Sequence, residues 1–139
     1  MSDETDLSAT EHTSASMSVP GSARVTWPGV KKVASIIRLR PEKAEEYFAL
    51  HAAVWPGVQE RLRASNITNY SIFLRDGLLF GYYEYVGDDY EADMAAISAD
   101  ETTRAWWKLT DPCQEAVASA APGEWWAEAV EVFRLDEPQ

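Results

Sequence analysis

A single stretch, residues 67–86, decides the fold: ITNYSIFLRDGLLFGYYEYV. It is rich in β-branched and aromatic side chains, which favour strands. In its middle stands Asp76-Gly77, a pair that favours the two-residue turn between antiparallel strands. The sequence therefore predicts a β-hairpin with strands over 67–75 and 78–86.

The segment before the hairpin predicts a strand followed by a helix. Residues 33–40 read VASIIRLR, and Pro41 is typical of a first helical turn. Over residues 41–63 the helical spacing is carried by Tyr47, His51, Val54, Trp55, Val58 and Leu62. Pro56 lacks a backbone N–H, so we expect a kink or a break near Trp55.

Two helices and a last strand are expected after the hairpin. Residues 90–99 predict a short helix, and residues 101 to about 120 predict a second one with Asp100 as its N-cap. Pro122-Gly123 then interrupts the chain before residues 126–135, where apolar and polar residues alternate as in a strand. The order β-α-β-β-α-β is the ferredoxin-like arrangement of an α+β protein, with helices on one face of an antiparallel sheet.

Both faces of the predicted hairpin carry apolar side chains, although helices would cover only one of them. A sheet face in water is not expected to carry such residues, so a second copy of the chain is the simplest cover. We therefore expect a homodimer with sheets packed face to face. The two alternating sets are Leu78, Phe80 and Tyr82, and Leu79, Tyr83 and Tyr85.

Length and composition limit the remaining possibilities. A chain of 139 residues allows one domain, which we place at 28–139. Residues 1–27 are rich in Ser, Thr, Asp and Glu, which predicts a disordered acidic extension. The net charge of -11 argues against binding to nucleic acid or to an anionic membrane. No apolar run approaches the roughly twenty residues of a membrane span and no signal peptide is recognisable, so we expect a cytoplasmic protein.

Cysteine and histidine patterns predict no metal site. Cys113 is the single cysteine, and no CxxC or Cys/His cluster offers tetrahedral spacing. We expect Cys113 to be a small buried apolar residue.

The run Tyr47-x-x-x-His51-x-x-x-Trp55 places a phenol, an imidazole and an indole on one stripe of a helix. His12 lies in the predicted extension, so imidazole chemistry falls to His51. A lone histidine on an apolar helix face is more often a packed core residue. Its aromatic neighbours, with Tyr70 on a strand beneath, instead favour a site for a sugar, where rings pack on C–H faces and polar groups bind hydroxyls.

Other aromatic and acidic residues are ambiguous. In Trp106-Trp107 the side chains point about 100° apart, so we expect one in the core and one facing a cavity. Structural or interface roles are expected for Trp125, Trp126, Tyr82, Tyr83 and Tyr85. The acids Glu84, Asp100 and Asp111 could orient a hydroxyl, although capping or surface roles are the commoner ones for such residues.

These motifs resemble the L-rhamnose mutarotase family in order and spacing over residues 33–135. The resemblance implies a dimeric α+β barrel, without metal or organic cofactor, that interconverts the α and β anomers of a 6-deoxy-L-sugar such as L-rhamnose or L-fucose. It is carried by the stripe ending in Trp55-Pro56 and by Asn69-Tyr70-x-Ile72, Leu78-Leu79-Phe80, Trp106-Trp107-Lys108-x-Thr110-Asp111 and Glu131-Val132-Phe133.

The resemblance also implies roles for individual residues. His51 matches the catalytic proton donor of the family, and the substrate-contacting residues are matched by Tyr47, Tyr70, Trp106 and Trp107. Gly57 and Thr68 depart from residues common in the family, which leaves the preferred sugar open. Two other functions fit the same fold: a non-catalytic protein that binds a small ligand, and a cofactor-free oxygenase acting on an aromatic substrate.

Overall fold

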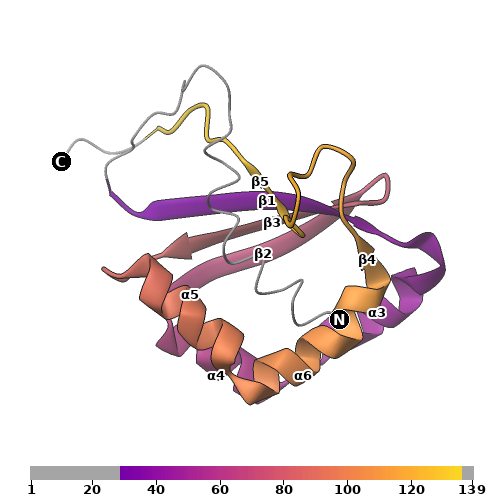
Figure 1. Cartoon of the computed structure of the whole chain (residues 1–139), viewed down its shortest axis with the longest axis horizontal. Helices are drawn as coiled ribbons and strands as arrows, with labels where there is room; N and C mark the ends of the chain where they lie inside the picture. The colour runs from indigo at the N-terminus through magenta and orange to yellow at the C-terminus, as the bar shows by residue number, and fades with distance from the viewer. Residues whose placement is uncertain (1–28, 136–139) are drawn as a thin grey trace.

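The computed structural model, which describes residues 29–135, is an antiparallel sheet with helices gathered on one face (Figure 1). The strand order is β2-β3-β1-β4, and β5 also pairs with β1. This is the predicted α+β, ferredoxin-like arrangement; the predicted extension over 1–27 lies outside the described residues. The elements are β1 (Lys31–Leu39), η2 (Pro41–Lys43), α3 (Ala44–Ala52), α4 (Pro56–Ala64), β2 (Ile67–Arg75), β3 (Leu78–Tyr85), α5 (Tyr90–Ala99), α6 (Glu101–Thr110), η3 (Asp111–Cys113), β4 (Gln114–Glu115) and β5 (Ala127–Ala129).

Local sequence signals determine the helix break and the hairpin. The break is confirmed, since α3 ends at Ala52 and α4 begins at Pro56. Trp55 between them has extended backbone (φ -61°, ψ 135°), as expected before a proline. The hairpin is also confirmed, because Asp76 and Gly77 both have positive φ (54° and 75°), which the tight turn requires.

The helix predicted from 101 to about 120 is correct at its start and wrong at its end. Asp100 is the N-cap, its Oδ2 accepting from the backbone N of Thr103 at 2.9 Å. The helix stops at Thr110 because Pro112 would remove a hydrogen bond and clash with the preceding turn. The chain continues through η3 into β4, whose two residues pair with the end of β1.

The strand predicted over 126–135 is shorter than expected. Of this segment only β5, residues Ala127–Ala129, is a strand, and it pairs with β1 in the register Ala34↔Ala129 to Ile36↔Ala127. Residues 130–135 have no regular structure despite their alternating pattern, because a strand needs a neighbouring backbone as well as a suitable sequence. Val132, Phe133 and Leu135 are 89%, 71% and 85% exposed.

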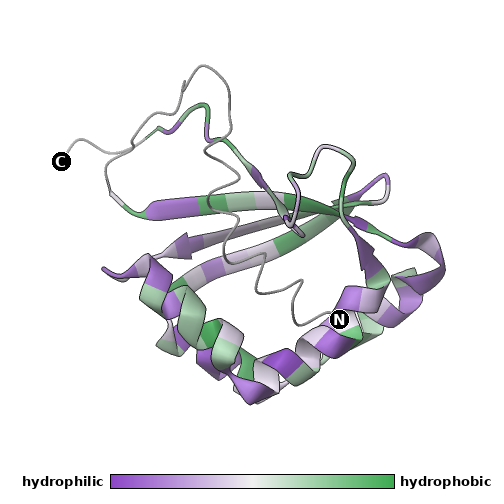
Figure 2. Cartoon of the chain, in the orientation of Figure 1, coloured by the Kyte–Doolittle hydropathy of each residue, from purple (hydrophilic) through white to green (hydrophobic). Residues whose placement is uncertain are grey.

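The core lies between the sheet and the helices. Figure 2 shows a hydrophilic start to β1 and apolar residues along its middle, where Ile37 is fully buried. Cys113 is also fully buried, which confirms its interpretation as a small apolar core residue. A Cβ on Gly57 would lie 3.1 Å from Cγ2 of Thr102, so this glycine permits the close approach of α4 to α6.

Residues 29–135 contain neither a membrane-spanning helix nor a cluster of metal-binding side chains. No helix there is long and apolar enough to cross a membrane. Within the same residues, no group of three or more His, Cys, Asp or Glu side chains could hold a metal ion. The cytoplasmic location and the absence of metal and cofactor stay predictions.

Candidate active site

A cavity of ≈ 220 Å³ lies between the inner, helix-facing side of the sheet and the helices. All the site residues expected from the sequence line it: His51, Tyr47, Tyr70, Trp106 and Trp107. A second cavity of ≈ 740 Å³ shares these residues and extends between α3, α4 and β2, where its lining is mainly apolar. The His51 imidazole therefore lies where the two cavities meet. The first cavity, with its hydroxyls and carboxyl groups, is the more polar half of this interior, and the second is the apolar half.

His51 is held by its own helix and by two aromatic rings. Its Nδ1 lies 3.0 Å from the backbone oxygen of Tyr47. Because a carbonyl only accepts, Nδ1 carries the proton and Nε2 remains available to a ligand. The Tyr47 ring lies 4.2 Å from the imidazole centroid, and the Trp106 ring meets it edge-on at 5.5 Å. This packing restricts the ring to one orientation.

A buried polar chain holds Tyr47. The indole Nε1 of Trp125 donates to Oε1 of Gln114 at 3.2 Å, and Nε2 of Gln114 donates to the Tyr47 hydroxyl at 3.2 Å. Since an indole N–H can only donate, it fixes the orientation of the Gln114 amide. The Tyr47 hydroxyl keeps its own proton for another acceptor, and burial, followed by the nearby Tyr70, raises its pKa.

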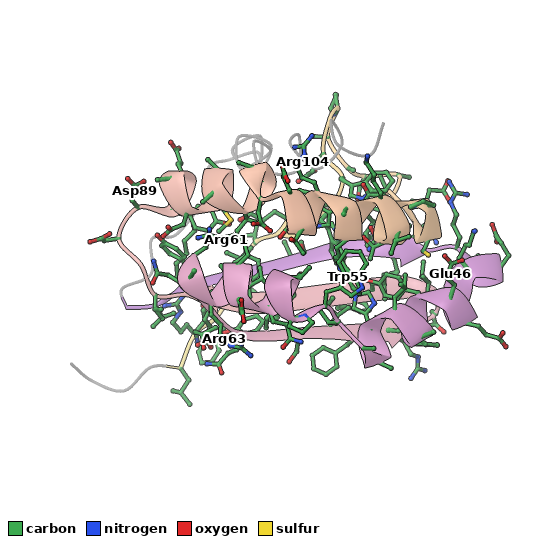
Figure 3. The ribbon with its side chains drawn as sticks, turned by 90° about the horizontal axis from the view of Figure 1, so that it is seen from below. Glu46, Trp55, Arg61, Arg63, Asp89 and Arg104 are labelled. Atoms are coloured by element: carbon green, nitrogen blue, oxygen red, sulfur yellow. The ribbon has the colours of Figure 1, made fainter. Side chains whose placement is uncertain are left out.

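Both tryptophans of α6 line the cavity, so the expected division into one core and one cavity residue does not hold. Trp106 is only 5% exposed and packs edge-on against Trp55 at 5.3 Å. Figure 3, which looks onto the helices, shows Trp55 where α3 gives way to α4, beside α6. Trp107 packs against the core cluster of Ile67, Tyr85 and Ile97.

Tyr70 enters the cavity from β2. Its ring lies 5.4 Å from that of Tyr83, whose hydroxyl is 2.5 Å from the hydroxyl of Tyr90. Although 43% of Tyr70 is exposed, the loss of water around its hydroxyl, with Tyr90 as second cause, raises its pKa to about 12. Burial also raises the pKa of Tyr83 and of Tyr90. These phenols are therefore neutral hydrogen-bonding groups near neutral pH.

Several residues that line the cavity were not expected there from the sequence. Tyr83 and Trp126 were expected to be structural or interface residues, and both line the cavity. A Cβ on Gly81 would lie 3.1 Å from the Trp126 ring, so this glycine makes room for the indole against the sheet. The sequence did hold a signal of this close approach, because Gly81 is a glycine inside a predicted strand.

Two carboxylates also line the cavity, and neither was assigned to it from the sequence. Asp111, expected to be a capping or surface residue, is only 3% exposed. Glu128 faces inward because β5 pairs it with Ser35 of β1. Among the other acids, Asp100 caps α6 and Glu84 bonds to side chains on the outer face.

Aromatic rings, neutral hydroxyls, two carboxylates and one oriented imidazole surround the same space. Such a lining suits a small polyhydroxylated ring and can transfer protons to and from it. The fold and the cavity thus define a ferredoxin-like α+β protein with an aromatic cavity whose lining is suited to proton transfer.

Comparison with known proteins identifies the family. A model of the L-rhamnose mutarotase family matches residues 32–135, and the chain belongs to this family. L-rhamnose mutarotase of Listeria monocytogenes (serotype 4b) is 38% identical over 95 residues, which cover 67% of this chain and 88% of that protein. The Bacillus subtilis enzyme is 34% identical over 109 residues, covering 77% and 100%.

Solved structures support the fold. The crystal structure of L-rhamnose mutarotase from Formosa agariphila superposes with a TM-score of 0.58 at 20% identity, covering 76% of this chain and 99% of that one. Tetracenomycin F2 cyclase from Streptomyces glaucescens, a type-II polyketide cyclase, superposes with a TM-score of 0.55 at 14% identity, covering 78% and 99%. At these identities the likeness concerns the fold alone.

Proposed function

We propose that this protein is an isomerase that interconverts the α and β anomers of L-rhamnose or a related 6-deoxy-L-sugar such as L-fucose. The observation that carries the proposal is the oriented His51, whose Nε2 remains available in a cavity lined by Tyr47, Tyr70, Trp106 and Trp107. The family membership supports the same reaction.

The reaction requires proton transfer and the reversible opening of the sugar ring. With both ring nitrogens protonated, and Nδ1–H still bonded to the backbone oxygen of Tyr47, His51 donates a proton from Nε2 to the ring oxygen while the anomeric hydroxyl loses its proton. The bond between C1 and the ring oxygen breaks, and C1 becomes an aldehyde carbon. Rotation about C1–C2 presents the other carbonyl face, and closure returns one proton to His51 and the other to the new anomeric oxygen. A positioned acid of this kind contributes about 10²- to 10⁴-fold.

The anomeric proton needs a separate acceptor. The cavity tyrosines are poor candidates near neutral pH, because burial raises the pKa of Tyr70 to about 12 and raises those of Tyr47 and Tyr83 as well. These hydroxyls can donate hydrogen bonds to the sugar. The carboxylates of Asp111 and Glu128 line the same cavity and can accept the proton directly or through water.

The tryptophans suit the remaining surface of a sugar. The indoles of Trp106, Trp107 and Trp126 line the cavity and present ring faces or edges to C–H groups. The apolar half of the interior, shared with the second cavity, suits a methyl group such as C6 of a deoxysugar.

We also propose that the protein is a homodimer joined through the outer face of the sheet. On that face Phe80 of β3 pairs with Phe73 of β2 and with Ile36 of β1. Phe73 is 64% exposed and Phe80 is 40% exposed. Two copies related by a twofold axis would bury this apolar face on itself. The negative net charge makes nucleic acid an unsuitable alternative partner.

The proposal is tested by exchange NMR of the anomeric protons of L-rhamnose and L-fucose with catalytic amounts of protein. We expect the wild type to accelerate exchange, His51→Ala to lose about 10²- to 10⁴-fold, and His12→Ala, which changes the other histidine, to match the wild type. The faster sugar identifies the substrate. Sugar binding without accelerated exchange would instead support a non-catalytic binding protein, and oxygen consumption with an aromatic substrate would support an oxygenase.

A further inference from the structure

We propose that Asn69 is a positioning residue that places Tyr70 in the cavity by holding a β-bulge in β2. The inference rests on the proposed function, since it concerns a residue of that site. Neither Asn69 nor Glu84 lines the cavity.

The register of the hairpin shows the bulge. Thr68 pairs with Glu84 and Ser71 pairs with Tyr82, so two residues of β2, Asn69 and Tyr70, stand opposite Tyr83 alone. Asn69 has a φ of 51°, the left-handed conformation, within an otherwise extended strand. The bulge therefore inserts one extra residue into β2.

The extra residue decides which face Tyr70 occupies. Side chains alternate along a strand, and Ile67, opposite the buried Tyr85, is on the inner face. In a regular strand Tyr70, three residues later, would point to the outer face. After the bulge Tyr70 lies beside the ring of Tyr83, 5.4 Å away, and lines the cavity. The bulge also places Ile72 on the inner face, opposite Gly81.

Hydrogen bonds on the outer face accompany the bulge. Nδ2 of Asn69 donates to Oε1 of Glu84 at 2.8 Å, and the Tyr82 hydroxyl donates to Oε2 of the same carboxylate at 2.7 Å. These two bonds, Asn69 first, hold the pKa of Glu84 below its ordinary value, so it is an anion near neutral pH. Asparagine adopts the left-handed conformation more easily than most residues, so Asn69 supplies both the backbone angle and the donor.

The test compares three substitutions. Asn69→Val cannot adopt the left-handed angle without strain, and we expect kcat/KM to fall about 5- to 30-fold. Asn69→Gly keeps the angle and loses only the side-chain bond, so it should stay within about threefold of the wild type. Asp76→Val places the same residue at the other left-handed position of the hairpin that is not a glycine (φ 54°), and should lose stability without losing activity.

A double-mutant cycle separates positioning from a general structural role. If Asn69 acts through Tyr70, Asn69→Val should cost less than about twofold in a Tyr70→Ala background. An undiminished loss in that background, or wild-type activity of Asn69→Val, would overturn the inference. Sedimentation velocity on the same variants must show an unchanged oligomeric state, since Asn69 bonds to Glu84 on the proposed dimer face.

A structural measurement separates this inference from the proposed function. Nuclear Overhauser contacts between the rings of Tyr70 and Tyr83 should be present in the wild type and Asn69→Gly and lost in Asn69→Val. Should the wild type fail to accelerate anomer exchange, this result still decides whether Asn69 places Tyr70. Retained ring contacts in a folded Asn69→Val protein would contradict the proposal on its own.

Discussion

The two faces of the β2–β3 hairpin have different surroundings, although their residues alternate along the same strands. On the inner face of β3, Leu79, Gly81 and Tyr83 lie against the core or the cavity. On the outer face, Phe80 and its neighbour Phe73 are exposed. Because side chains alternate between the two faces of a strand, the same hairpin lines the candidate active site on one face and forms an apolar surface on the other.

Hydrophobicity alone does not distinguish the cavity-lining inner face of the hairpin from its exposed outer face. Both sets are apolar or aromatic, but the inner tyrosines lie among other hydroxyls and carboxylates, whereas Phe80 has only apolar cross-strand partners, Phe73 and Ile36. Substitutions can therefore disturb the candidate active site and the outer apolar surface separately. The alternation of side chains between the two faces is interrupted at the bulge that contains Asn69.

The largest expected effect is on the outer face. Phe80→Asp should weaken the proposed dimer by about 10²- to 10⁴-fold, because burial of a phenylalanine stabilises by about 1.5–3 kcal/mol and a twofold axis counts it twice. Sedimentation velocity across a concentration series measures the change. Phe48→Asp is the matched control, since Phe48 is 55% exposed but lies on α3. Equal dissociation of both variants, or of neither, would remove the outer face as the interface.

An intermediate effect is expected from the buried chain behind the inner face. Gln114→Leu leaves the indole N–H of Trp125 without its acceptor and removes the donor to Tyr47, so it should lower the free energy of unfolding by about 1–3 kcal/mol. Urea unfolding measures this loss. Gln59→Leu, which removes a half-buried bond to the backbone oxygen of Val54 and leaves no buried donor behind, is the control and should lower stability by only about 0.5–1 kcal/mol. A loss in Gln114→Leu no greater than in the control would show that the chain contributes little.

The sequence was sufficient for elements with local signals. Asp76-Gly77 marks the turn, Pro56 divides the helix, and the spacing of Tyr47 and His51 stacks them on α3. These features depend on neighbours within a few residues, so periodicity and turn chemistry predict them. The end of α6 was also readable, because Pro112 lies within the segment predicted as helix.

Features that depend on distant pairing were not predictable in the same way. Glu128 faces the cavity only because of the register of β5 on β1, and Gln114 does so because β4 pairs with the end of β1. Tyr70 was predicted as a site residue, but a regular strand would have pointed it outward. The register and the bulge come from contacts between segments far apart in sequence, which local patterns do not contain.

The smallest effect compares two tyrosine–carboxylate pairs on β3 by their pH dependence. The Tyr85 hydroxyl donates to Asp93 at 2.5 Å on the inner side, as Tyr82 does to Glu84 on the outer side. Hydrogen bonds from Tyr85, and then from Asn66, lower the pKa of Asp93 below its ordinary 3.8. A lowered folded-state pKa contributes stability that is fully present above pH 3.8 and is lost as the pH falls through the folded-state value.

Asp93→Asn should therefore melt below the wild type at pH 6, and the difference should shrink as the pH falls below 3.8, where the wild type loses the contribution that the variant lacks. Glu84→Gln should follow the same course below its ordinary 4.5. Differential scanning fluorimetry from pH 3 to 7 compares them. A pH-independent difference for Asp93→Asn would mean that the charge of the carboxylate contributes nothing. A larger effect from Glu84→Gln would mean that the outer face is the better shielded side, as it would be within a dimer.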